Sequence, residues 1–334
     1  MPAALSSRIP ALDAFRGFTV AAMLLVNNPG TWSAIYWPLE HAEWHGWTPT
    51  DLIFPFFLFI VGITTELAKK DTLGILKRGG IILLCGLLLN QFPYFNFATM
   101  RWTGVLQRIG IVYIVAALIA MKASRRVILG IVIVILFGYW FVLTRGPLQP
   151  PDATIAAQVD RALIPEAHLW KQSKTWDPEG PLSTIPAIAT ALIGILVAPW
   201  VKAKNLGRLV LFGVAATAIG LAWGLVFPIN KNLWTSSYVV FTAGAASLLL
   251  ALWIWKLPAE PFRVFGMNPL IAFVGSGGMA RVLGMTKWGA KSYRAFYKPY
   301  FEPHLASLLW ALTFVLFWYA VLWWLDRKRI YVRA

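Results

Sequence analysis

Long apolar runs recur along the chain, and they restrict its fold more than any other feature. A helix of about 20 apolar residues crosses the hydrocarbon core of a bilayer. We find ten such runs, near residues 13–28, 50–68, 74–91, 103–121, 125–144, 182–201, 206–227, 235–256, 264–283 and 304–325. The first is short, and Gly266 and Pro269 interrupt the ninth. The runs predict an all-α polytopic membrane protein of about ten transmembrane helices. We expect a single domain over residues 1–334, with a long loop at 145–181.

Charge content and charge distribution agree with this interpretation. Charged residues make up 13% of the chain, whereas about 25% is typical of a soluble domain. The formal net charge of +16 would suggest a nucleic-acid partner in a soluble protein. Here most of the basic residues lie in or next to the loops between apolar runs, with no denser patch among them. We therefore expect a lipid bilayer, and no nucleic acid, as a partner.

The basic residues are distributed unevenly between the two alternating sets of loops. The set that includes both termini carries 17 of them, and the other set carries ten, four of which lie in the 145–181 loop. Loops rich in Lys and Arg stay in the cytoplasm, and long loops count least in this comparison. Both termini are therefore expected in the cytoplasm, with His41 and the 145–181 loop on the opposite side.

A histidine precedes the second apolar run. His41 can accept and return a proton near neutral pH, so it is a candidate catalytic residue; the alternative is a hydrogen-bonded histidine at the membrane interface. Asp51 begins the run, where a carboxylate stabilises a first helical turn or orients His41. His45 follows His41 at the spacing of half a zinc site. Glu43 is one position away from the place that the zincin motif requires, and we expect no metal.

Other charged and polar residues lie in the predicted spans or between them. Arg16 follows Asp13 by three residues, which fits a surface ion pair or an arginine that meets an anionic ligand from the cytoplasm. Arg108 lies well inside an apolar run, where a charge costs about 2.5–3.5 kcal/mol, so it should face a cavity or a partner. Asn230 and Lys231 lie between two spans and either bind an anion or end a helix.

Aromatic and acidic residues gather on the predicted outer side. Trp44 and Trp176 offer flat faces on which a sugar ring could stack, or they belong to an aromatic belt at the lipid headgroups. Asp177 and Glu179 lie in a turn that proline and glycine enforce. Their carboxylates suit a sugar hydroxyl or an amine, and the alternative is a solvated turn.

Six short segments carry a more specific pattern. They lie at residues 11–17, 41–55, 104–110, 177–180, 228–234 and 266–269. In this order they resemble the heparan-alpha-glucosaminide N-acetyltransferase family of membrane acetyltransferases. The segments at 41–55 and 228–234 are specific to that family, whereas the first is also similar to a stretch in membrane sugar O-acyltransferases.

The resemblance implies a reaction and a cellular setting. Cytosolic acetyl-CoA would acetylate a glucosamine amine on the far side of the membrane, with His41 as the active-site histidine. No segment matches the large luminal N-terminal domain of the animal enzymes, so we expect a compact bacterial-type member in the inner membrane, acting on free or short amino sugars. Assembly as a homodimer is left open.

The residue pattern and the resemblance together predict three groups of site residues. The catalytic pair is His41 and Asp51. Residues assigned to acetyl-CoA, a co-substrate, are Arg16, Gln107, Arg108, Lys231 and Asn268. Residues assigned to the amino-sugar acceptor are Glu43, Trp44, Trp176, Asp177, Glu179 and Asn230.

Alternatives remain for the mechanism and for the function. His41 either deprotonates the acceptor amine or carries the acetyl group itself. Sugar O-acetylation is the alternative within the same class of enzyme. An amino-sugar transporter is the alternative from another class, and the absence of an internal repeat in the sequence argues against it.

The predicted orientation can be tested by cysteine labelling. Cys85 is the only cysteine, so its replacement by serine gives a background without thiols. Gln172→Cys should then react only with an impermeant maleimide added from outside, and Lys204→Cys only after the membrane is opened. The reverse labelling pattern would contradict the direction of acetyl transfer.

Overall fold

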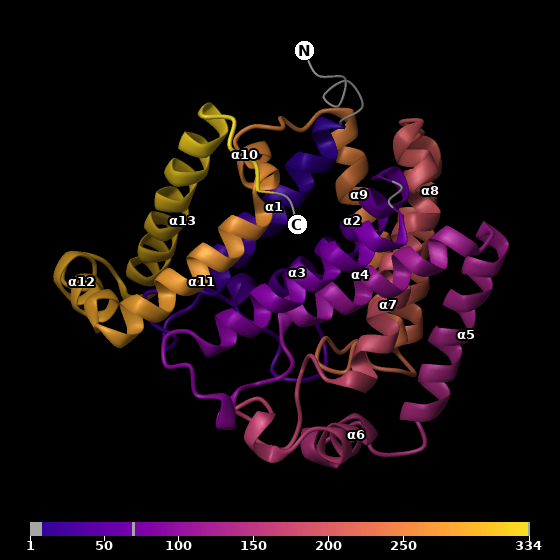
Figure 1. The fold of residues 1–334 in the computed structure, drawn as a ribbon, viewed down its shortest axis with the longest axis horizontal. Coiled ribbons are helices and arrows are strands. Elements are labelled where there is room, and N and C mark those ends of the chain that lie inside the picture. Colours follow the sequence, from indigo (N-terminus) through magenta and orange to yellow (C-terminus); the bar gives the residue numbers. More distant parts are fainter. Residues whose placement is uncertain (1–8, 69–70, 333–334) are drawn as a thin grey trace. The chain divides into compact units, whose positions relative to one another are not determined.

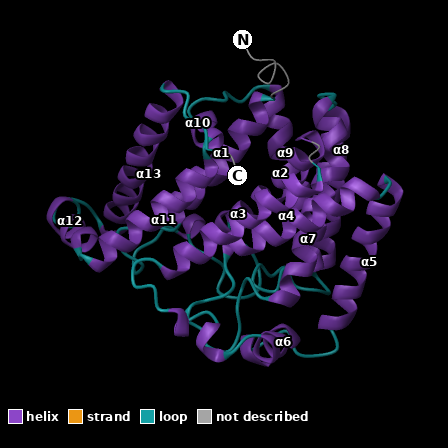
Figure 2. Ribbon diagram, viewed as in Figure 1, coloured by secondary structure: helices purple, strands orange, loops and turns teal. Residues whose placement is uncertain are grey.

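The computed structural model describes residues 9–68 and 71–332. Across these residues the chain forms helices and loops and no strand, so the predicted all-α class is confirmed (Figures 1 and 2). Two compact units share the chain. The central unit comprises His41–Pro199 and Leu211–Ala246, and the terminal unit comprises the described residues up to Glu40, Trp200–Val210 and those from Ser247 onward.

Eight helices in the described residues are long and apolar enough to cross a membrane, which identifies an integral membrane protein. They are Pro49–Ala68, which joins the short helix η3 (Pro49–Leu52) to α2 (Ile53–Ala68), then α3 (Thr72–Gln91), α4 (Val105–Lys122), α5 (Arg125–Leu143), α7 (Pro181–Lys202), α8 (Leu206–Gly224), α9 (Ser236–Trp255) and α13 (Pro303–Arg327).

The first and ninth predicted spans form shorter helices. The first is α1 (Pro10–Val26). The ninth divides at Asn268 into α10 (Phe262–Met267) and α11 (Pro269–Met285), because Pro269 has no N–H to continue a helix but is well suited to start one. The count of ten spans, the cytoplasmic termini and the single domain therefore stay predictions. Four basic residues of the charge comparison lie outside the described residues: Arg8, Lys69, Lys70 and Arg333.

Several short elements cover the loops. Two further helices are α6 (Ile155–Leu163), within the long 145–181 loop, and α12 (Trp288–Phe296). Four 3-10 turns complete the described chain: η2 (Trp37–Leu39), η4 (Phe97–Thr99), η5 (Pro151–Ala153) and η6 (Glu166–His168). The Thr154 side chain accepts a hydrogen bond from Ala157 N–H at the start of α6, so the long loop contains a capped helix.

Glycines bring the helices of the central unit into backbone contact. A Cβ atom added to Gly62 on α2 would lie 1.9 Å from the Ala191 carbonyl oxygen on α7, and one added to Gly194 would lie 2.2 Å from the Phe59 carbonyl oxygen. Small residues allow this approach in membranes, where van der Waals packing holds helices together. These contacts hold the middle of α2 directly against the middle of α7.

The same kind of contact joins α1 to α10 in the terminal unit. A Cβ atom added to Gly17 would lie 1.7 Å from the Phe262 carbonyl oxygen, and one added to Gly266 would lie 1.8 Å from the Asp13 carbonyl oxygen. Each helix therefore fits against the backbone of the other, and neither position tolerates a side chain without movement.

The contact between α2 and α7 generates a stability prediction. Gly62→Ala should destabilise the protein by about 1–3 kcal/mol, because the methyl group must displace the α7 backbone. The matched control is Gly138→Ala on α5, where nothing lies within 4 Å of the added Cβ atom. Thermal unfolding in detergent should show a lower melting temperature for Gly62→Ala only. Equal melting temperatures would show that the two helices separate easily.

Candidate functional site

The central unit holds His41 against a buried carboxylate. His41 Nδ1 lies 2.7 Å from Asp51 Oδ1, and the His41 side chain is 46% exposed whereas that of Asp51 is 2% exposed. Because a carboxylate only accepts hydrogen bonds, Nδ1 must carry the proton that it donates. The lone pair of the neutral imidazole then lies on Nε2, on the half-exposed ring.

Local backbone groups hold Asp51 in place. Its Oδ2 atom accepts hydrogen bonds from the Ala42 and Thr48 N–H groups, at 3.0 and 3.1 Å, and from the Thr48 hydroxyl at 3.2 Å. The Tyr238 hydroxyl donates to the Asp51 carbonyl oxygen at 2.5 Å. Asp51 therefore belongs to the capping box of its own helix and contacts the His41 ring at the same time.

Lys231 reaches the same pair from the loop between α8 and α9. Its Nζ atom lies 3.4 Å from Asp51 Oδ1 and 3.0 Å from His41 Nδ1. Burial lowers the pKa of Lys231, while the charges of Asp51 and Glu179 oppose that shift. His41, Asp51 and Lys231 thus form one polar cluster from two loops that are distant in sequence.

Asn230 joins those two loops. Its amide nitrogen donates to the Trp44 carbonyl oxygen at 2.8 Å and lies 3.3 Å from His45 Nδ1, and its amide oxygen accepts from Leu233 N–H at 2.8 Å. Asn230 is fully buried, so it contacts protein atoms on all sides. Burial lowers the pKa of His45, which suits a neutral ring that accepts this bond.

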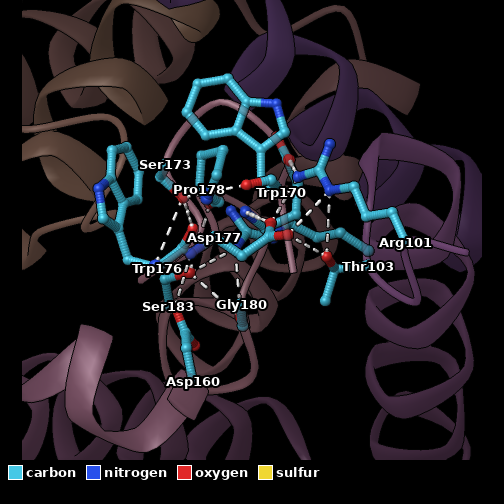
Figure 3. A network of polar contacts seen from close by, with 12 residues as sticks. Arg101, Thr103, Asp160, Trp170, Ser173, Trp176, Asp177, Pro178, Gly180 and Ser183 are labelled. Carbon is cyan, nitrogen blue, oxygen red and sulfur yellow. Dashed lines mark hydrogen bonds and ion pairs between the residues drawn. The ribbon is translucent and has the colours of Figure 1, made fainter. Parts of the chain in front are cut away.

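A second network surrounds the turn between α6 and α7 (Figure 3). Arg101 Nε donates to Asp177 Oδ2 at 2.8 Å, and its Nη2 atom contacts Asp177 Oδ1 and Glu179 Oε2, both at 2.5 Å. The Thr103 hydroxyl also donates to Asp177. Burial opposes the charge of Arg101, but the two carboxylates outweigh it and raise the pKa of Arg101 above its usual range.

Asp160 on α6 supports this turn from the other side (Figure 3). Its Oδ2 atom accepts a hydrogen bond from Asp177 N–H at 2.9 Å, and its buried Oδ1 atom has no hydrogen-bond partner among the described residues. Burial, reinforced by the negative charge of Asp177, raises the pKa of Asp160 to about 7. Asp160 is therefore an acid that titrates near neutral pH.

Arg108 lies inside α4 and is 1% exposed. Its Nη2 atom donates to the Ser183 hydroxyl and to the Gly180 carbonyl oxygen, and its guanidinium carbon lies 5.0 Å from the centre of the Trp234 ring. Two further nitrogens, Nε and Nη1, have no hydrogen-bond partner among the described residues. Arg108 thus connects the turn after Glu179 to the loop that carries Lys231.

Tryptophans lie between the two networks. The ring centres of Trp44 and Trp176 are 5.3 Å apart, and those of Trp176 and Trp170 are 5.4 Å apart, both in edge-to-face arrangements. Trp44 donates from Nε1 to the Leu148 carbonyl oxygen at 2.8 Å, which holds its ring in place. Glu43, next to Trp44, is exposed.

Three predicted residues remain: Arg16 and Asn268 in the terminal unit, and Gln107 in the central unit. In the terminal unit, Arg16 contacts Asp13 at 3.0 Å and the Gly266 carbonyl oxygen at 3.1 Å. The Asn268 side chain accepts from Val332 N–H at 2.9 Å and donates to the Ile330 carbonyl oxygen at 3.0 Å. In the central unit, Gln107 is buried beside Gly104.

Two charged members of the networks, Arg101 and Asp160, are not among the predicted site residues. Arg101 counted only as a basic residue in a loop, because Asp177, the carboxylate that it binds, lies 76 residues away. Asp160 lies in the middle of the long loop, where no sequence motif distinguishes it. The one signal in the sequence is the position of Arg101, just before the span that contains Arg108. That position does not identify an acidic partner.

Fold and site together define an integral membrane protein with a carboxylate-anchored histidine beside a lysine. Residues 8–209 match the family model described as "Heparan-alpha-glucosaminide N-acetyltransferase, catalytic", so the chain belongs to that family and the resemblance is confirmed. The matched segment includes His41, Asp51 and the Arg101 network.

Two similar proteins bear the same description. The human heparan-alpha-glucosaminide N-acetyltransferase is 27% identical over 409 aligned residues, and the mouse protein is 26% identical over 403. Each alignment covers 96% of this chain and 60% of the relative. The chain therefore spans somewhat less than two thirds of the length of these relatives.

Asp160 gives a prediction about pH and stability. Its pKa is about 7 in the folded chain and 3.8 when unperturbed, so the folded state binds more protons than the unfolded state between these pH values. Stability must therefore fall as the pH rises through this window. Asp160→Asn removes the titration, and its melting temperature relative to wild type should rise by a few degrees from about pH 5 to pH 8. A constant difference across this range would contradict the assignment.

Proposed function

We propose that the chain is a membrane acetyltransferase that moves the acetyl group of acetyl-CoA to the amine of glucosamine or of a glucosamine-ended glycan. The observation that carries the proposal is the contact of His41 with the buried carboxylate of Asp51, 2.7 Å away. Membership of an N-acetyltransferase family supports the reaction class. The anchored ring supports the assignment of His41 as the residue that handles the proton.

The site residues account for the proton transfers. A protonated amine has no lone pair, so it must lose a proton before it can attack a thioester. His41 Nε2 accepts that proton while Asp51 stabilises the imidazolium through Nδ1–H. In the alternative route, Nε2 attacks the thioester first and carries the acetyl group to the amine. The same anchored imidazole serves both routes, because each uses Nε2 as the reacting atom.

The acceptor lies, in this proposal, against Trp44 and Trp176. Aromatic faces suit a sugar ring, and exposed Glu43 is a carboxylate available to its ammonium group. Asp177 is fully enclosed and shares Arg101 with Glu179. We therefore assign Asp177 to positioning the turn and Glu179 to the acceptor. Asn230 fits this proposal because its hydrogen bond to the Trp44 carbonyl oxygen joins the loop that carries Lys231 to the loop that carries Trp44.

The donor arrives from the cytoplasm in this proposal. Acetyl-CoA is a co-substrate, and its phosphates need cations on that side of the membrane. Arg16 remains the proposed phosphate contact, and it donates to the carbonyl oxygen of Gly266, two residues before Asn268 at the start of α11. Gln107 and Arg108 remain proposed contacts for the part of the donor inside the membrane. We place the protein in a bacterial inner membrane with His41 on the extracytoplasmic side.

Acetyl transfer by the purified protein tests the proposal directly. Acetyl-CoA and glucosamine should give free CoA thiol and N-acetylglucosamine in equal amounts, measured by thiol release and by mass spectrometry. Glucose should not be acetylated, because it has no amine to occupy the acidic side of the site. Glucose acetylation at the same rate would instead favour a sugar O-acyltransferase.

Loss of His41 tests its role in that reaction. His41→Ala should reduce turnover by at least about 10²–10⁴-fold, because general-base catalysis is lost, while the melting temperature changes little. The matched control is His45→Ala, which removes a nearby imidazole held only by Asn230 and should be much milder. Near-normal turnover of folded His41→Ala would remove His41 from the mechanism.

A further inference from the structure

The position of Lys231 relative to the His41 ring is unusual for a simple ion pair. Lys231 Nζ lies 3.0 Å from His41 Nδ1 and 3.3 Å from His41 Nε2. In the ring plane, a position close to both nitrogens is blocked by the C–H group between them. The amine must therefore lie over the face of the imidazole. This leaves the in-plane direction of Nε2 open.

The backbone around Lys231 is firmly held. Trp234 N–H donates to the Lys231 carbonyl oxygen at 3.1 Å, and Thr235 N–H donates to the Asn230 carbonyl oxygen at 3.1 Å. Gly46 N–H donates to the Ile229 carbonyl oxygen at 2.8 Å, so the loop is also tied to the His41 loop. The side chain of Lys231 is 21% exposed, which leaves its ammonium group partly accessible.

We propose that Lys231 is a catalytic residue that donates a hydrogen bond to the oxyanion formed at the acetyl carbon during transfer. The inference rests on the proposed acetyltransferase function and deepens it. The nucleophilic nitrogen forms a bond to the thioester carbon, and the carbonyl electron pair moves to oxygen. When this pair returns, the carbon–sulfur bond breaks and CoA leaves as a thiolate. In direct transfer the amine proton passes through His41 to that thiolate. In the acetyl-histidine route the thiolate takes a proton from water, and His41 Nε2 accepts the amine proton when its bond to the acetyl group breaks.

This role fits both routes that remain open for His41. Direct attack by the amine and attack by His41 Nε2 each produce a tetrahedral carbon close to Nε2. An ammonium group over the same ring lies within reach of the oxygen on that carbon. Preorganised donors aimed at developing charge are among the largest contributions to catalysis.

A phosphate-binding role for Lys231 is less compatible with the geometry. The phosphates of CoA are separated from the thioester by the whole pantetheine arm. A cation 3.3 Å from His41 Nε2 therefore meets the acyl end of the donor if His41 takes part in the transfer. Lys231 then remains a donor-binding residue, as the sequence predicted, but at the reacting end.

Chemical rescue gives a sharp test. Lys231→Cys is made in a Cys85→Ala background, which leaves a single thiol. Turnover should fall by about 10²–10³-fold, with a smaller change in the KM for acetyl-CoA. Alkylation with 2-bromoethylamine rebuilds an ammonium side chain of nearly the same length and should restore most of the lost turnover. Alkylation with iodoacetamide, which adds a neutral group, should not.

The outcomes separate this inference from the function on which it rests. Without acetyl transfer by the Cys85→Ala parent, both fail. An active parent with unchanged turnover in Lys231→Cys overturns the role of Lys231 alone. Rescue by both reagents, or by neither in a folded protein, also overturns it. If the cysteine variant does not fold, Lys231→Gln replaces it, and a folded Lys231→Gln with wild-type turnover contradicts the proposal.

Discussion

The carboxylate of Asp51 is the group on which the candidate site depends. It receives two backbone N–H groups, a hydroxyl, the His41 ring and the Lys231 ammonium group. A buried carboxylate is costly unless such partners compensate for lost hydration. The hydrogen bonds from these partners replace the water that the buried carboxylate of Asp51 has lost. The loop that carries His41 and the loop that carries Lys231 converge for this reason.

Arg101 performs the same task for the other half of the site. It neutralises part of the charge of Asp177 and Glu179, and Asp160 holds the backbone of the same turn. Arg108 also donates to the Gly180 carbonyl oxygen of this turn, so two arginines and three carboxylates meet here.

Much of the fold could be predicted because hydrocarbon imposes a length on each apolar helix. The predicted run at 74–91 corresponds to α3 (Thr72–Gln91), and the run at 125–144 to α5 (Arg125–Leu143). The bounds of the ninth span were harder to predict. The hydropathy pattern shows a single run at 264–283, whereas Pro269 starts a new helix within it. The pairing of His41 with Asp51 was predictable as an option, because only ten residues separate them.

The remaining site contacts join residues that no local pattern relates. Lys231 lies 190 residues from His41, and Arg101 lies 78 residues from Glu179. Spacing carries no information at such separations, so the charges could be counted but not paired. Arg108 shows the limit most clearly, because its place in an apolar run predicted a buried partner without indicating that Ser183 and Trp234 would supply it.

The paired glycines of α2 and α7 have a mechanical consequence. Asp51 begins the span that continues into α2, and the turn with Glu179 leads directly into α7. Because Gly62 and Gly194 place the two backbones in direct contact, we expect these two helices to move together as one rigid pair. Thermal motion that opens or closes the site must then come from the loops at the end of these two helices. A change in bilayer thickness or lateral pressure would then act on the helix pair as a whole and leave the distance between Asp51 and Glu179 unchanged.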